Sequence, residues 1–232
     1  MSKLKPVDLF VEGLLGQWVL DQCNPDDIGT VWSVDQGTTR YAESKGFNAE
    51  SLPSNWPEKV TGHTMLNVHG QRIFPAEFLA KYKVAYNIHP SYLPYGKGYN
   101  SVFWALWNEE PAGASLHELD QGIDTGPIID RQRVDYDDST FLRELLEKVD
   151  QAQKQVFLRN WPKILEGAEL EKTSVVQQGS SYPHKTYVEL ITELRQNWQD
   201  LTSQELVRVL RCLHTFPVKL GSRTILINAR AN

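Results

Sequence analysis

Short apolar runs alternate with amphipathic stretches through the first two thirds of the chain, a pattern typical of α/β proteins. The apolar runs predict strands at residues 7–11, 29–34, 64–68, 83–89, 113–118 and 127–134. Apolar residues at helical spacing predict helices at residues 17–23, 39–45, 76–81, 99–108 and 141–165. This order of elements predicts a Rossmann-like, open and mostly parallel sheet.

Local signals add detail to this pattern. Residues 48–62 contain several Pro, Ser and Asn residues, which predict mostly loop. Pro75 suits the first position of a helix, and Ser139 or Thr140 can cap the long helix. Pro162 marks a kink or a restart in that helix.

The character of the chain changes after residue 168. Residues 169–176 predict a strand and residues 177–181 a loop. Helical periodicity follows at residues 187–195 and 203–212, and residues 215–228 predict a hairpin with a glycine turn. We therefore predict a Rossmann-like domain at residues 1–168 and a small α+β region at residues 169–232.

Composition and charge exclude several classes of protein. With 232 residues and a 41% hydrophobic share, the chain can form one large core with a smaller appendage. A net charge of −5 gives no general basic field, so we expect no nucleic-acid partner. No apolar run is long enough to cross a bilayer, so we expect no membrane partner. The two cysteines lack metal-ligand spacing and predict a reduced, cytoplasmic protein.

Candidate chemistry begins at the end of the strand predicted at residues 83–89. Asn87 and His89 alternate along this strand and therefore point the same way, and Asp124 follows in a turn rich in Gly and Asp. Taken singly, each has an ordinary structural interpretation: a satisfied amide, a packing imidazole and a turn carboxylate. Together, an amide donor, an imidazole and a carboxylate are the groups that acyl transfer to an amine needs.

Two longer motifs around these residues resemble a known family, the 10-formyltetrahydrofolate-dependent formyltransferases. Residues 87–94 match its Asn-x-His-Pro-Ser-x-Leu-Pro loop, and residues 120–126 match its Asp-x-Gly-x-Asp-Thr-Gly signature. The resemblance covers residues 7–165. Near its start, residues 12–16 depart from the family: only Gly13 and Gly16 are present, and Glu12 stands where small residues are usual. A plain βα turn is favoured there over a dinucleotide site.

The resemblance implies specific roles for several residues. Asn87, His89 and Asp124 would be the catalytic set, with no metal required. The folate co-substrate would bind beside Arg72, Ile73, Phe74, Leu119, Asp120 and Gly122. His117 falls where some members carry a histidine, and packing is an equally good interpretation of it.

The tail and one loop of the chain bear on the identity of the acceptor amine. The tail and the loop with Tyr92, Tyr95, Lys97 and Tyr99 look like those of sugar-nucleotide N-formyltransferases. Aromatic rings suit stacking on a sugar or base, and Lys97 is either a phosphate partner or a solvated lysine. We therefore predict formyl transfer to a nucleotide-linked amino-dideoxy sugar by a homodimer. The alternatives are a phosphoribosylglycinamide formyltransferase and a non-catalytic folate-binding protein.

Overall fold

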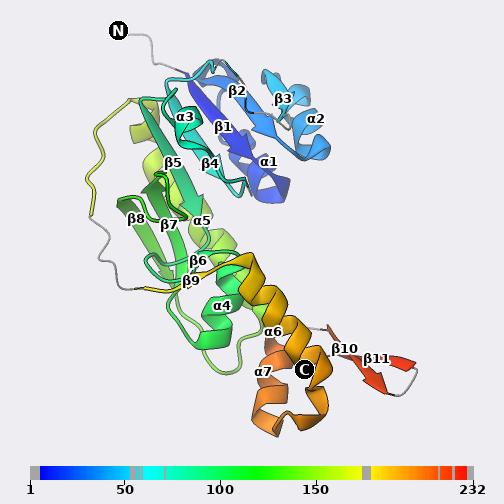
Figure 1. Ribbon diagram of the computed structural model, residues 1–232. Helices are drawn as coiled ribbons and strands as arrows, with labels where there is room; N and C mark the ends of the chain where they lie inside the picture. Colours follow the sequence, from blue (N-terminus) through cyan, green and yellow to red (C-terminus); the bar gives the residue numbers. More distant parts are fainter. Residues whose placement is uncertain are drawn as a thin grey trace.

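The computed structural model describes residues 6–52, 56, 58, 60–70, 72–173, 179–213, 215–220 and 223–228 (Figure 1). Its main element is a seven-stranded sheet in the order β3-β2-β1-β4-β5-β7-β8. These strands are β1 (Val7–Val11), β2 (Ile28–Ser33), β3 (Ala49–Ser51), β4 (Thr64–Val68), β5 (Val84–His89), β7 (Ala112–Glu118) and β8 (Ile128–Val134). The strands from β3 to β5 run parallel, whereas β7 is antiparallel to both β5 and β8. The predicted Rossmann-like, mostly parallel sheet is confirmed.

Alternating side chains of the central strands supply two separate hydrophobic clusters. Leu9 and Leu66 pack on one face with α1 (Gly13–Asp21), α2 (Gln36–Ser44) and α5 (Leu142–Leu165). The intervening residues, such as Phe10 and Met65, pack on the other face, which α3 (Ala76–Leu79) covers with an aromatic cluster. Burial on both faces explains why these strands read as continuous apolar runs.

Several predicted boundaries near the N-terminal half were wrong. Helix α1 begins at Gly13, inside the predicted turn, because glycine adopts φ +62° there and the chain passes directly from β1 into the helix. Pro75 precedes α3 instead of occupying its first turn. Residues 48–62, predicted as mostly loop, also contribute β3, a three-residue strand at the edge of the sheet.

The long helix α5 differs from its prediction at both ends. Its N-cap is Phe141, whose backbone N–H donates to Glu144 at 2.8 Å, whereas Ser139 and Thr140 hydrogen-bond to Asp137 in the preceding turn. Pro162 lies within the helix, which continues to Leu165. The predicted kink or restart therefore does not interrupt it.

The segment after α5 contacts the sheet through the backbone of Thr173 and through an ion pair between Lys172 and Glu118 at 2.7 Å. The strand predicted at residues 169–176 is wrong over the described residues 169–173, where only Thr173 pairs with Ile128. Residues 174–178 lie outside the described residues. In the predicted loop, β9 (Ser181–Tyr182) pairs parallel with β6 (Lys97–Gly98).

The C-terminal elements form a narrower part of the molecule that extends from the sheet (Figure 1). Helices α6 (His184–Gln196) and α7 (Ser203–Leu213) share an apolar cluster with α4 (Ser101–Asn108) and α5. Strands β10 (Thr215–Leu220) and β11 (Arg223–Asn228) form the predicted hairpin, whose turn residues lie outside the described residues. The division at residue 168 stays a prediction.

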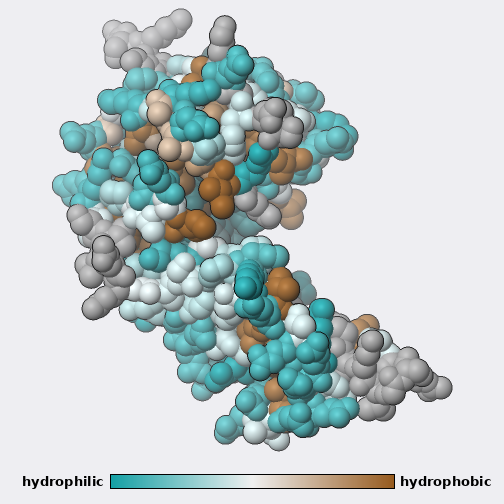
Figure 2. Space-filling view, viewed as in Figure 1, coloured by the Kyte–Doolittle hydropathy of each residue, from teal (hydrophilic) through white to brown (hydrophobic). Residues whose placement is uncertain are grey.

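The surface changes where the two parts meet. A notch separates the broad part that holds the sheet from the narrower part, and hydrophobic residues gather beside it (Figure 2). Among the helices described, none is both long and apolar enough to cross a membrane.

Candidate active site

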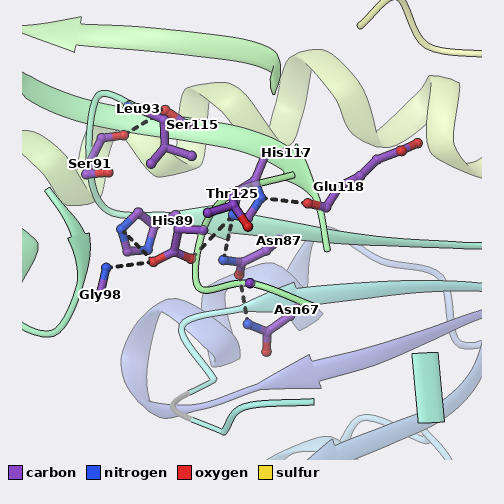
Figure 3. Close-up of polar contacts among 12 residues, drawn as sticks. Asn67, Asn87, His89, Ser91, Leu93, Gly98, Ser115, His117, Glu118 and Thr125 are labelled. Carbon is purple, nitrogen blue, oxygen red and sulfur yellow. Dashed lines mark hydrogen bonds and ion pairs between the residues drawn. The ribbon is translucent and has the colours of Figure 1, made fainter. Parts of the chain in front are cut away.

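Asn87 and His89 lie at the C-terminal end of β5, and both are buried. Their alternation along the strand places both side chains on the same face (Figure 3). Asp124 comes from the loop between β7 and β8, where it has a positive φ of +53°. Its Oδ2 lies 3.4 Å from His89 Nε2. The structure therefore brings the three predicted catalytic residues together.

A chain of hydrogen bonds orients the Asn87 amide (Figure 3). Asn67 Nδ2 donates to both the Gly70 carbonyl, at 3.4 Å, and Asn87 Oδ1, at 2.7 Å. Asn87 Nδ2 lies 3.0 Å from His117 Nε2, and His117 Nδ1 lies 2.7 Å from the Glu118 carbonyl. Because a carbonyl only accepts, His117 donates through Nδ1 and accepts from Asn87 through Nε2. The second N–H of Asn87 remains available to a ligand.

His89 and Asp124 are held by the backbone of the loop after β5. His89 Nε2 lies 3.1 Å from the Gly96 carbonyl, so this nitrogen carries a hydrogen. Gly98 N donates to Asp124 Oδ2 at 2.8 Å. His117 Nε2 also lies 3.6 Å from Asp124 Oδ1. Burial favours the neutral carboxyl, but the nearby His89 and His117 rings and the Gly98 N–H outweigh it and hold the pKa of Asp124 well below its usual range. Asp124 is therefore a carboxylate at neutral pH.

A second group of contacts fixes the start of this loop on the sheet. Ser115 on β7 donates to the Ser91 carbonyl at 2.7 Å and accepts from Leu93 N at 3.0 Å (Figure 3). Arg131 on β8 donates to the Leu93 carbonyl at 2.7 Å, and its guanidinium lies 4.6 Å from the centre of the Tyr92 ring. The residues between His89 and Gly96 thus have little freedom to move.

The segment after residue 178 holds the other end of the loop. Ser180 Oγ accepts from Gly96 N at 2.7 Å and donates to the Glu110 carboxylate. Tyr182 donates its hydroxyl to the same carboxylate at 2.7 Å and stacks on Trp104 with ring centres 4.4 Å apart. Residues far apart in sequence therefore support the loop that carries the contacts to His89 and Asp124.

These groups border a cavity of about 880 Å³. It is lined by all three predicted catalytic residues and by all six residues predicted to bind folate: Arg72, Ile73, Phe74, Leu119, Asp120 and Gly122. The Arg72 guanidinium lies 4.6 Å from the centre of the Trp56 ring. Asp120 accepts from Gly122 N and from Thr125 Oγ1, so it also orders the turn before Asp124.

Only one of the four residues predicted to bind the acceptor lines the cavity. Tyr99 lines the cavity, with its ring centre 4.5 Å from that of His184. Tyr92, Tyr95 and Lys97 are not among the lining residues; Lys97 instead pairs with the tail through β6. None of residues 12–16 lines the cavity either.

Sequence reasoning missed several residues of the site. Asn67 is the penultimate residue of β4 and pairs directly with Asn87, so a polar residue near the end of the neighbouring apolar run was an available signal. Ser180 and Glu110 gave no such signal, because their contacts depend on tertiary packing. In the described part of the chain, no three His, Cys, Asp or Glu side chains are grouped to hold a metal ion.

Comparisons with known proteins agree with this geometry. Residues 40–160 match the family described as formyl transferase. GDP-perosamine N-formyltransferase from Brucella melitensis is 37% identical over 78 residues, which span 32% of this chain and only 30% of that protein. A 4-N formyltransferase from Francisella tularensis superposes with a TM-score of 0.78 at 18% identity, over 100% of this chain and 99% of the other. An N-formyltransferase from Helicobacter canadensis was solved with folinic acid and dTDP-3-aminofucose. It superposes with a TM-score of 0.72 at 20% identity, over 90% of this chain and 81% of the other.

Proposed function

Because the chain belongs to the formyl transferase family, we propose that it transfers a formyl group from 10-formyltetrahydrofolate to a primary amine. The observation that carries this proposal is the convergence of Asn87, His89 and Asp124 in one cavity. An amide donor, an imidazole and an ionised carboxylate supply oxyanion stabilisation and proton transfer. A binding protein without turnover would not need this set.

The Asn87 amide is suited to stabilise the oxyanion that forms when an amine attacks a formyl carbon. Asn67 and His117 orient this amide, so its second N–H points at a fixed place without reorganisation. His89 Nε2 is engaged by the Gly96 carbonyl, so a protonated His89 ring would donate to the oxyanion from Nδ1. Losing one such donor typically costs about 100- to 1,000-fold in rate.

Asp124 is suited to move the proton that the attacking amine loses. The low pKa of its carboxyl keeps it charged, and its 3.4 Å approach to His89 orients that ring. A proton accepted from the amine, directly or through water, would then pass to the departing folate nitrogen. Such acid–base terms are worth roughly 100- to 10,000-fold in rate.

The cavity fits the folate co-substrate, which supplies the formyl group when bound. Phe74 and Leu119 provide apolar surface for a flat ring, and the buried Asn67 Oδ1 has no hydrogen-bond partner in the described structure. Arg72 and the backbone of residues 119–124 would contact the polar edge of the ring. No metal takes part in this proposal.

A nucleotide-linked amino-dideoxy sugar is the proposed acceptor. The matched relative from Brucella melitensis carries a sugar-nucleotide name, and the Helicobacter canadensis structure contains an amino-sugar nucleotide. The C-terminal part is packed against the catalytic loop, and its Tyr182 and Tyr187 line the cavity. Glycinamide ribonucleotide is the alternative acceptor. The product would serve the synthesis of surface glycans such as O-antigen.

The proposed assembly is a homodimer formed through the hairpin. Ile225 and Leu226 on β11 are 45% and 59% exposed although both are large and apolar. A second copy covering them would remove this surface from water. Location in the cytoplasm stays a prediction from the sequence.

The decisive experiment is an assay of tetrahydrofolate release with a panel of amino-sugar nucleotides and with glycinamide ribonucleotide. We expect turnover with an amino-sugar nucleotide and none with the ribonucleotide. Asn87→Ala and His89→Ala should each reduce kcat by about 100-fold or more with folding preserved. Turnover only with the ribonucleotide would reject the acceptor, and folate binding without turnover would reject catalysis.

A further inference from the structure

The cavity continues past the catalytic residues to an end bordered by α4, α5 and α6. Tyr187 on α6 packs edge-on against Phe103 on α4, with ring centres 5.0 Å apart, and against Tyr99, at 5.6 Å. All three line the cavity. This aromatic wall lies apart from the residues assigned to folate, so this end is available to the acceptor.

One face of α5 forms the opposing wall. Leu142, Leu146, Val149 and Gln153 all line the cavity, and their spacing of four, three and four residues places them on one side of the helix. The first three are apolar, and Leu146 is 47% exposed. Two polar residues of α5 line the cavity beyond this apolar stripe: Gln153, and Asp150, whose carboxylate pairs with Lys154 at 2.7 Å.

The Gln153 side chain is buried without being satisfied. The residue is 4% exposed, yet its Oε1 has no hydrogen-bond partner in the described structure. Buried polar atoms in native proteins are rarely left in this state. Because Gln153 is a lining residue of the cavity, its unpartnered acceptor points to a donor group brought by a ligand.

The chemistry of Oε1 limits what that ligand group can be. A carbonyl oxygen accepts hydrogen bonds and repels phosphate oxygens, so it is unsuited to a diphosphate. A neutral sugar hydroxyl is a suitable donor, and apolar carbon atoms of a deoxy sugar suit Val149 and Leu146. The amine itself must lie at Asn87 and His89 to react.

We propose that Gln153 determines acceptor specificity: its Oε1 accepts a hydrogen bond from a ring hydroxyl of the amino sugar. This inference rests on the proposed function, because it assumes that the acceptor is a sugar nucleotide. It assigns to α5 the recognition of the sugar, separately from the residues that perform the transfer.

The test compares Gln153→Leu, which removes the acceptor atom at similar size, with Gln153→Glu, which keeps it. Gln155→Leu is the matched control, since Gln155 is exposed on the same helix. For Gln153→Leu we expect KM and calorimetric Kd for the amino-sugar nucleotide to rise about 3- to 10-fold. The KM for 10-formyltetrahydrofolate and the kcat should stay near wild type, as should all parameters of Gln155→Leu and the acceptor Kd of Gln153→Glu.

A deoxy analogue that lacks the hydroxyl adds a direct readout. Wild type should bind the analogue more weakly than the parent, whereas Gln153→Leu should bind the two equally. If Gln153→Leu does not fold, Gln153→Asn replaces it in the comparison, because its shorter side chain moves the amide away from the ligand. The assignment of Gln153 is overturned, and the proposed function is not, by either of two results. One is an unchanged acceptor Kd in a folded variant; the other is an equal weakening of binding for 10-formyltetrahydrofolate. Absence of binding and turnover with every amino-sugar nucleotide in wild type overturns the proposed acceptor and this inference together.

Discussion

Replacing Ser180 by alanine tests whether the C-terminal segment supports catalysis. Ser180 Oγ is 2.7 Å from the N–H of Gly96, which is a buried residue whose carbonyl holds His89. The substitution leaves that N–H without a partner, at a cost of about 1–3 kcal/mol. If this cost destabilises the loop conformation in which the Gly96 carbonyl holds His89, kcat decreases roughly 5- to 150-fold.

The assay is the initial rate of tetrahydrofolate release at saturating concentrations of both substrates, with urea unfolding in parallel. Ser180→Thr retains the hydroxyl and should recover most of the activity. Ser203→Ala, an exposed serine in α7, is the control and should match wild type in both measurements. A lower unfolding free energy with wild-type kcat in Ser180→Ala would refute the reasoning, since Ser180 would then stabilise the fold without positioning His89.

Further predictions concern the carboxylate, the loop glycine and the hairpin. Asp124→Asn should reduce kcat by roughly 100- to 10,000-fold. Because the pKa of Asp124 is lowered on folding, its stabilisation is complete above the unfolded value of about 4 and is lost as pH falls below it. The difference in unfolding free energy between wild type and Asp124→Asn should therefore shrink on acidification; a difference independent of pH contradicts this. Gly98→Ala should lower the Tm more than Gly46→Ala, since both have positive φ but only Gly98 would place a Cβ 2.7 Å from the Tyr182 carbonyl; equal losses of Tm would contradict the clash. Leu226→Glu should shift sedimentation from dimer to monomer, and unchanged sedimentation would exclude the hairpin as the interface.

The sheet was predictable because its signal is local. Strands such as β4 and β5 are buried on both faces, so their sequences are continuous apolar runs. The alternation of Asn87 and His89 follows from strand geometry in the same way. The start of α1 was missed because Gly13, at positive φ, belongs equally well to a turn and to a helix start.

The supporting contacts of the site were not predictable because they join distant parts of the chain. β6 and β9 are two residues each, too short to give a periodic signal, and they pair residues that lie far apart in sequence, Lys97 with Ser181 and Gly98 with Tyr182. The same pairing brings Ser180 to Gly96 and Tyr182 to Glu110. The role assigned to Gln153 depends likewise on the cavity around it, since its own sequence context is an ordinary polar helix.

By itself the sequence determined the sheet, the helices that cover it and the strand end that carries Asn87 and His89. Continuous apolar runs and helical patterns contain this information, since burial acts on each segment separately. Only the tertiary structure decided how the amide of Asn87 is oriented, which backbone atoms hold His89 and Asp124, and which end of the cavity faces α5. These features depend on hydrogen bonds and packing between residues far apart in sequence, which only the complete fold brings into contact.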